Sequence, residues 1–255
     1  MIGHPATRVL NALVYHPDKH VAQTPAAFGL DYRDLTMRTA DGLDVHGWFV
    51  RAERPRAHIL YAHGNAGTIG DRVSIIALLV AAGFDVLAFD YRGFGHSAGS
   101  PGEQGTYLDA RAARTALLDQ PEVDPDRVLY LGKSLGGGVL LELATEFPPA
   151  GMILMSTFSG MRDAARSVYP FLPAPLIPNA YPSLRRIADL RVPVLMMHGD
   201  RDELLPLRHA ERLYAAANEP KELVVVPGAG HNDVIDTLGP RWPQLIGDWF
   251  VASIA

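Results

Sequence analysis

Apolar and polar residues alternate along the chain in blocks that predict buried strands separated by helices. Residues 32–39 and 43–51 alternate on either side of Asp41-Gly42, a dipeptide typical of tight hairpin turns. This opening predicts an antiparallel hairpin. The short apolar runs that follow lack alternation, as strands buried on both faces of a sheet do. These runs cover residues 58–62, 86–89, 127–133, 152–155, 193–197 and 222–226.

Segments with apolar residues at helical spacing lie between these runs. The predicted helices cover residues 71–82, 105–119, 137–146, 207–217 and 233–253. Strands that alternate with helices in this order predict an α/β fold, with a mostly parallel central sheet and helices on both faces. We expect a single domain over residues 1–255, with an N-terminal antiparallel hairpin and at most a small lid.

One long connection, residues 157–190, has no clean period and is rich in proline. One interpretation is a small lid or a wall of an apolar acyl pocket. The alternative is a core helix over residues 161–169 followed by a stiff surface connection. The candidate pocket residues are Phe158, Tyr169, Phe171 and Leu172, together with Phe94 from an earlier loop.

The composition narrows the classes of function. Of 255 residues, 48% are hydrophobic and 20% are charged, as in an ordinary globular enzyme. A formal net charge of −5 gives no basic surface for nucleic acid. The chain has no cysteine, which excludes disulfides and thiolate zinc sites. No spacing of metal ligands and no phosphate-binding glycine loop is present, so we expect neither a metal nor another cofactor.

No segment predicts export or membrane insertion. The first ten residues lack a basic region followed by a long apolar core, so they do not form a signal peptide. The longest apolar stretch, residues 74–84, is too short to span a bilayer. We therefore expect no transmembrane segment and a cytoplasmic location, unless a leader has already been removed. The oligomeric state is not predicted.

A glycine-rich turn separates the apolar run 128–131 from a helix that starts on small residues. The turn reads Gly-Lys-Ser-Leu-Gly at residues 132–136. A serine at the apex of a strand-turn-helix unit is typical of the nucleophile elbow, where the hydroxyl stands clear of the sheet and the glycines avoid collisions. Ser134 is therefore the candidate nucleophile. The alternative is a glycine-rich turn whose serine has no chemical role.

A serine hydroxyl needs a base to take its proton and an acid to orient that base. His231 stands in a flexible loop after the last strand, where it can reach back over the sheet edge. Asp202, in the turn after the run 193–197, is the predicted acid. Asp200 is expected instead to bind backbone N–H groups of that turn.

Two further histidines follow the candidate nucleophile. His198 stands at a strand end beside Gly199 and is expected to be a hydrogen-bonded structural residue. His209 stands on a helix face and is expected to be solvated. Neither is the predicted base.

Acyl transfer also requires hydrogen-bond donors for the negative charge that develops on the substrate oxygen. The backbone N–H of Leu135 follows the candidate nucleophile and lies at a helix start. We expect the second N–H from the loop of residues 63–67 and assign it to Asn65. The alternative is a plain turn between a strand and a helix. His63 itself is expected to be structural.

These segments together resemble the α/β-hydrolase superfamily, in which nucleophile, acid and base follow in this chain order. The resemblance spans nearly the whole chain. The matching stretches are TADGLDVHGWFV (39–50), HGNAG (63–67), DYRGFGHSAG (90–99), GKSLGG (132–137), HGDRDELLP (198–206) and PGAGHND (227–233). More narrowly, the chain is similar to the Bem46-like and ABHD13/ABHD17-like hydrolases, which are grouped with serine aminopeptidase-type sequences. Some relatives resemble membrane-anchored thioesterases, but this chain shows no N-terminal anchor and no cysteine-rich lipidation segment.

The sequence therefore predicts a serine hydrolase. The leading hypothesis is a carboxylesterase that cleaves small to medium acyl esters, its small-molecule substrates, through an acyl-enzyme intermediate. One alternative is an aminopeptidase or amidase, with Glu103 or Asp163 near the substrate amine; another is an acyl-thioesterase. A third is a non-catalytic binding protein on a hydrolase scaffold, which the presence of Ser134, Asp202 and His231 argues against.

Overall fold

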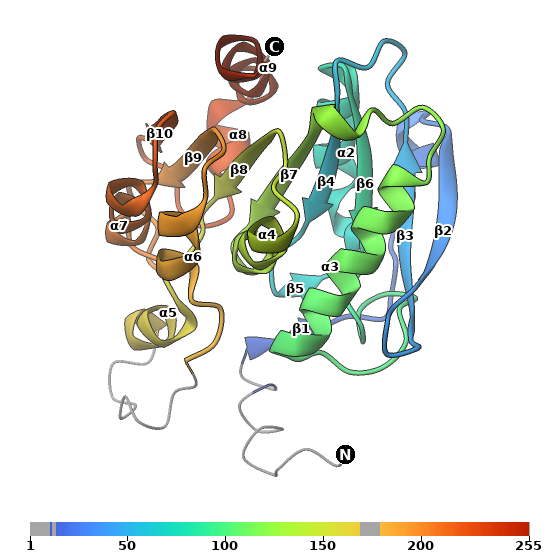
Figure 1. The fold of residues 1–255 in the computed structure, drawn as a ribbon, viewed down its shortest axis with the longest axis horizontal. Helices are drawn as coiled ribbons and strands as arrows, with labels where there is room; N and C mark the ends of the chain where they lie inside the picture. Colours follow the sequence, from blue (N-terminus) through green and yellow to red (C-terminus); the bar gives the residue numbers. More distant parts are fainter. Residues whose placement is uncertain (1–10, 12–13, 169–178, 255) are drawn as a thin grey trace.

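The computed structural model describes residues 11, 14–168 and 179–254. Its main strands are β2 (Tyr32–Arg38), β3 (Asp44–Val50), β4 (Ala57–Ala62), β6 (Phe84–Phe89), β7 (Val128–Lys133), β8 (Gly151–Met155), β9 (Val194–Gly199) and β10 (Lys221–Val226). Within the described residues they form an eight-stranded sheet in the order β10-β9-β8-β7-β4-β6-β3-β2 (Figure 1). β2 and β3 form the antiparallel hairpin, β3 pairs antiparallel with β6, and the other neighbours are parallel. The predicted sheet is confirmed.

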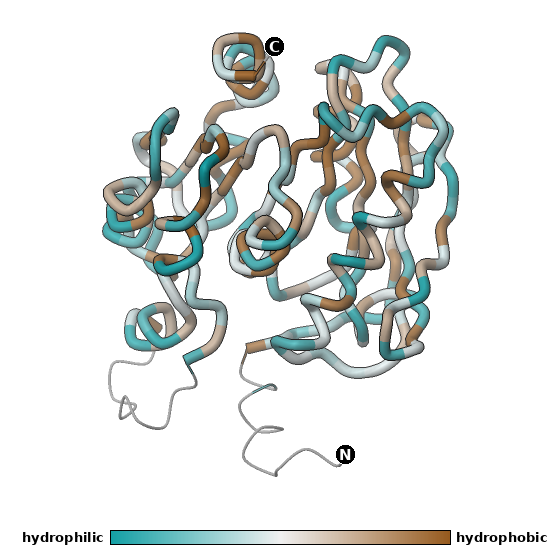
Figure 2. The backbone as a smooth tube through the Cα atoms, viewed as in Figure 1, coloured by the Kyte–Doolittle hydropathy of each residue, from teal (hydrophilic) through white to brown (hydrophobic). Residues whose placement is uncertain are grey.

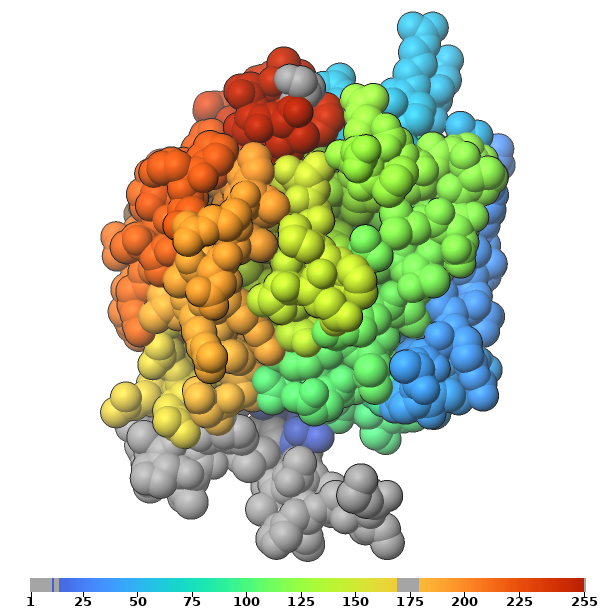
Figure 3. Space-filling model, viewed as in Figure 1, coloured from blue at the N-terminus to red at the C-terminus, as the bar shows by residue number. Residues whose placement is uncertain are grey.

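Helices cover both faces of this sheet, as predicted. One face carries α3 (Glu103–Leu118), α4 (Leu135–Glu146), α5 (Met161–Val168), α6 (Ser183–Asp189) and α7 (Arg208–Ala216). The other face carries α2 (Val73–Ala81), α8 (Val234–Leu238) and α9 (Arg241–Ser253). On the first face α4 lies between α3 and α6, and the space-filling view shows it flanked by them (Figure 3).

Two hydrophobic cores result, one on each face of the sheet. Side chains alternate along a strand, so Tyr130 of β7 joins the core under α3 and α4, whereas Leu129 and Leu131 join the core under α2 and α9. Every residue of β4, β6, β7, β8 and β9 is buried. Burial on both faces explains why these strands read as continuous apolar runs, which colour the middle of the sheet brown in Figure 2.

Some local elements differ from the prediction. The single helix expected over 233–253 is wrong, because Gly239 adopts φ 53° and Pro240 follows it, which ends α8 and starts α9. The helix α6 was not predicted. Five short elements were not predicted either: β1 (His16–Pro17), β5 (Ala66–Gly67), and the 3₁₀ helices η1 (Pro25–Phe28), η2 (Ile69–Arg72) and η3 (Pro125–Arg127).

Candidate active site

The turn after β7 places Ser134 in a strained backbone conformation. Ser134 adopts φ 52° and ψ −112°, a backbone region that residues other than glycine rarely occupy. The backbone is held there from both sides, because Ser134 N–H donates to Met155 O at 2.8 Å and Gly137 N–H donates to Ser134 O at 3.1 Å. The next residue, Leu135, begins α4. The strand-turn-helix unit predicted from the sequence is confirmed.

Glycines on both sides of the serine make this turn possible. A β-carbon at Gly132 would lie 2.5 Å from Gly137 Cα, and one at Gly136 would collide with the carbonyl oxygen of Ala62 in β4. Such separations are far below van der Waals contact. The two glycines therefore let α4 pack directly against the strands that carry the turn.

Ser134, His231 and Asp202 form one hydrogen-bonded chain. His231 Nε2 lies 3.2 Å from Ser134 Oγ, and His231 Nδ1 lies 2.7 Å from Asp202 Oδ2. Because a carboxylate only accepts hydrogen bonds, Nδ1 carries the proton and Nε2 is left to accept from the serine hydroxyl. Ser134 is nearly buried, with 7% of its surface exposed.

Asp202 is buried and has several hydrogen-bond donors around it. Its Oδ1 accepts from Leu205 N at 2.7 Å, and its Oδ2 lies 3.3 Å from His198 Nε2. Burial acts to raise the pKa of Asp202, but the hydrogen bonds from His198 and His231 outweigh it and hold the pKa well below its ordinary value. Asp202 is therefore an anion in the folded protein at neutral pH.

His198 has the structural role that the sequence predicts, whereas Asp200 binds a backbone N–H of another loop and not of its own turn. Asp200 Oδ1 accepts from Gly228 N at 2.6 Å, which joins the loop after β9 to the loop that carries His231. His198 is buried, and its Nε2 donates to Leu205 O at 2.6 Å. The second contact of His198, with Asp202, was not predicted. His198 and Asp202 are four residues apart in the sequence, and this spacing could have indicated the contact.

The loop after β4 passes beside the serine. A β-carbon at Gly64 would lie 3.7 Å from Ser134 Cβ. The Asn65 side chain is turned to Val14, whose carbonyl oxygen accepts from Asn65 Nδ2 at 2.8 Å, and Asn65 O accepts from His16 N at 2.9 Å. Any donor role of Asn65 toward substrate thus rests on its backbone N–H.

His63 anchors this loop, as expected of a structural residue. The ring is buried, its Nδ1 donates to Gly64 O at 2.7 Å, and its Nε2 lies 3.3 Å from Asp90 Oδ1. Phe94 packs edge-on against it, with ring centroids 5.5 Å apart. Phe94 is 0% exposed and supports His63 from within the core, and its role in a pocket stays a prediction.

The other pocket candidates lie in or near the connection 157–190. Phe158 is 3% exposed and packs against Tyr181, and its pocket role stays a prediction. Tyr169, Phe171 and Leu172 lie outside the described residues. α5 agrees with the alternative of a core helix, since Met161 and Ala164 are buried.

His209 was expected to be solvated, and this is wrong. It is 1% exposed and lies between α7 and α5, where Nδ1 is 3.0 Å from Ser159 Oγ and Nε2 is 3.1 Å from Ser167 Oγ. Burial, with the charge of Arg208 nearby, lowers the pKa of His209 to about 4. A polar histidine therefore fastens α5 to α7 in its neutral form.

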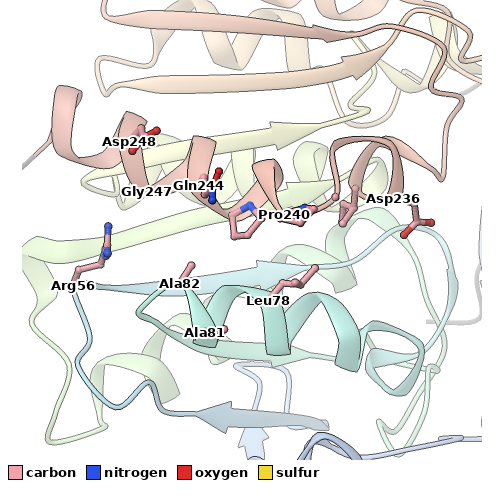
Figure 4. Close-up of a pocket in the computed structure, with 12 residues that line it drawn as sticks. Arg56, Leu78, Ala81, Ala82, Asp236, Pro240, Gln244, Gly247 and Asp248 are labelled. Carbon is pink, nitrogen blue, oxygen red and sulfur yellow. The ribbon is translucent and has the colours of Figure 1, made fainter.

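A hollow elsewhere on the surface holds none of these groups. It has a volume of 770 Å³ and runs between α2 on one side and α8 and α9 on the other, with Arg56 at one end and Asp236 at the other (Figure 4). Its walls are mainly apolar or small residues such as Leu78, Ala81 and Pro240.

Within the described ranges, no group of three or more His, Asp or Glu side chains is arranged to hold a metal ion.

Comparison with known families gives a match over residues 53–186 to the family described as "Serine aminopeptidase, S33". The protein Rv2307c of Mycobacterium tuberculosis is 41% identical over 224 residues, which cover 87% of this chain and 80% of that protein. The α/β hydrolase domain-containing protein WAV2 of Arabidopsis thaliana is 32% identical over 248 residues, covering 87% of this chain and 80% of its own.

Solved structures share the fold. The esterase Pf2001 of Pyrococcus furiosus superposes with a TM-score of 0.80 at 21% identity, covering 95% of this chain and 99% of its own. The esterase domain of a Rhodothermus marinus protein superposes with a TM-score of 0.68 at 22% identity, covering 88% of this chain and 100% of its own. At such identities the likeness concerns the fold, an α/β-hydrolase fold with a mostly parallel sheet between helices.

The buried His209 predicts a dependence of stability on pH. The folded-state pKa of about 4 lies below the unfolded value of 6.5, so the unfolded chain binds a proton that the folded chain does not as pH falls through that range. Through this group the wild type should lose about 2 kcal/mol of unfolding free energy between pH 7 and pH 5. Urea unfolding of wild type and His209→Asn at both pH values checks this. Equal pH dependence in the two proteins would contradict it.

Proposed function

Because the chain belongs to the serine aminopeptidase family of the α/β-hydrolase superfamily, we propose that this hydrolase is a serine carboxylesterase acting on small to medium acyl esters. The observation that carries the proposal is the hydrogen-bonded chain from Asp202 through His231 to Ser134. The esterases of Pyrococcus furiosus and Rhodothermus marinus, which share the fold, support the choice of ester. The whole chain would act as one catalytic domain.

In this proposal Ser134 Oγ attacks the ester carbonyl carbon while His231 Nε2 takes the hydroxyl proton. The tetrahedral intermediate collapses, the bond to the alcohol oxygen breaks, and the imidazolium returns the proton to that oxygen. Water then attacks the acyl-enzyme with His231 again as the base, which releases the acid and restores the serine. Asp202 stays ionised throughout and stabilises the imidazolium that forms in each half of the reaction.

The developing oxyanion would accept hydrogen bonds from two backbone N–H groups. Leu135 is the first residue of α4, where N–H groups lack partners within the helix and point toward the helix start. Asn65 follows Gly64, whose added β-carbon would lie 3.7 Å from Ser134 Cβ. Each such donor contributes about 3–4 kcal/mol to transition-state stabilisation in enzymes of this type.

The family description makes an aminopeptidase the second candidate. A substrate amine would need a free carboxylate, and the two candidates for that role are engaged. Asp163 Oδ2 accepts from Arg212 Nη1 at 2.7 Å, and Glu103 Oε1 accepts from Tyr107 Oη at 2.7 Å and from Tyr181 N at 2.8 Å. This engagement favours esters over peptides with a free amine.

The narrower assignments also belong to this proposal. We retain membership of the Bem46-like group and a cytoplasmic location as hypotheses. Among the described residues, no helix is both long enough and apolar enough to cross a membrane.

Replacing the proposed nucleophile should abolish turnover without unfolding the protein. The change Ser134→Ala removes one oxygen, and we expect kcat for p-nitrophenyl esters to fall by about 10⁴-fold or more. A panel from acetate to palmitate beside aminoacyl-nitroanilides distinguishes esterase from aminopeptidase. Normal hydrolysis by a folded Ser134→Ala protein, or faster cleavage of the anilides by the wild type, would contradict the proposal.

The two aspartates after β9 provide a matched pair. Asp202→Asn leaves His231 Nδ1 facing an amide, so kcat should fall by at least about 100-fold. Asp200→Asn keeps an acceptor for Gly228 N–H and should change kcat by less than about threefold. Measured kcat for both variants tests the assignment, and similar losses would argue that Asp202 is not specifically the acid.

Ester hydrolysis should require a neutral imidazole, because a protonated ring cannot accept the serine proton. We expect kcat/KM to rise with pH along an acid limb, because the base must be deprotonated to act. The measurement is a kcat/KM profile from pH 5 to 8, with circular dichroism as the control for folding. A flat profile in a folded enzyme would argue against a histidine base.

A further inference from the structure

Lys133 is a buried cation that the proposed mechanism does not use. It ends β7, directly precedes Ser134, and is 9% exposed. In the sequence, a lysine at the end of a buried strand could have indicated a special role for Lys133. The sequence did not identify its hydrogen-bond partner. Burying an ammonium group is unfavourable unless other groups compensate for the lost water.

The partner belongs to the loop of the proposed base. Lys133 Nζ donates to Asn232 Oδ1 at 3.1 Å, and Asn232 directly follows His231. Bonds to Asp200 and Asp202 tie this loop to the segment after β9. The bond from Lys133 instead ties it to β7, the strand that carries the serine.

Charges of both signs surround the ammonium group. Arg72 of η2 disfavours its charged form, whereas Asp202, Asp233 and Asp236 favour it. Side-chain alternation places Lys133 on the face of β7 shared with Leu129 and Leu131, toward α2 and α8. Asp236 of α8 is the residue at one end of the hollow in Figure 4.

We infer that Lys133 is a positioning residue that holds His231 within reach of Ser134 through its hydrogen bond to Asn232. The inference rests on the proposed function, since it concerns the base of that mechanism. Two loops from different strands must meet with the imidazole and the hydroxyl at hydrogen-bond distance, and a shift of about 1 Å is costly in catalysis. The Lys133 bond links the two partners of that contact.

A double-mutant cycle tests the inference on ester hydrolysis. Lys133→Met and Asn232→Ala should each lower kcat about tenfold with little change in KM, and the double variant should lose no more than either single one. Lys221→Met is the control, because Lys221 is also partly buried and its Nζ donates to Ala217 O at 2.8 Å. Asn232 lies in an exposed loop, so its variant keeps the test informative if Lys133→Met fails to fold.

The pH profile separates positioning from a general effect on stability. Lys133→Met removes the donor to Asn232, whereas Lys133→Arg keeps a charged donor and should retain more of the wild-type kcat. Burial lowers the pKa of Lys133 to about 8, so above that pH the wild type should lose rate relative to Lys133→Arg as its charged donor becomes neutral.

The outcomes distinguish this inference from the proposed function. If the wild type hydrolyses esters but Lys133→Met and Asn232→Ala keep its kcat, or if their losses add in the double variant, the positioning role is overturned. If the wild type hydrolyses no ester and its serine reacts with no fluorophosphonate, the proposed function fails first and the inference falls with it.

Discussion

The tight turn between β7 and α4 is the constraint on which the site depends. Ser134 can hold its left-handed conformation because Met155 and Gly137 bond its backbone and because Gly132 and Gly136 leave room for the helix. The turn raises the hydroxyl above the sheet edge and starts a helix beside it. The loops after β4, β9 and β10 are then placed around that one point, each anchored by polar contacts.

Parallel topology explains why so much of this arrangement could be predicted from the sequence. All parallel strands end at the same edge, so polar residues directly after apolar runs must gather there. Local patterns in the sequence were enough to predict the hairpin about Asp41-Gly42, the buried strands and the elbow. The contacts of His231 with Ser134 and Asp202 were predicted from chain order, and the structure brings those side chains together.

Features that depend on packing between distant segments could not be predicted in the same way. In the sequence His209 is a polar residue on a predicted helix. It is buried because Ser159 and Ser167, before and within α5, pack against its ring. Phe94 reads as a loop aromatic, and its role emerges once His63 is seen against its ring. Lys133 likewise has no visible partner in sequence, because Asn232 lies 99 residues away along the chain. The break between α8 and α9 was different: Gly239-Pro240 carried a local signal that helical periodicity concealed.

The central claim is that Ser134 is a nucleophile activated by its neighbours, and covalent labelling tests it most directly. The protein would be incubated with a fluorophosphonate at pH 8, and its intact mass and labelled peptide would be determined by mass spectrometry. We expect one adduct per chain, located on Ser134, and little labelling of a folded His231→Ala variant because the hydroxyl then lacks its base. An adduct on another residue, or no adduct on the folded wild-type protein, would contradict it.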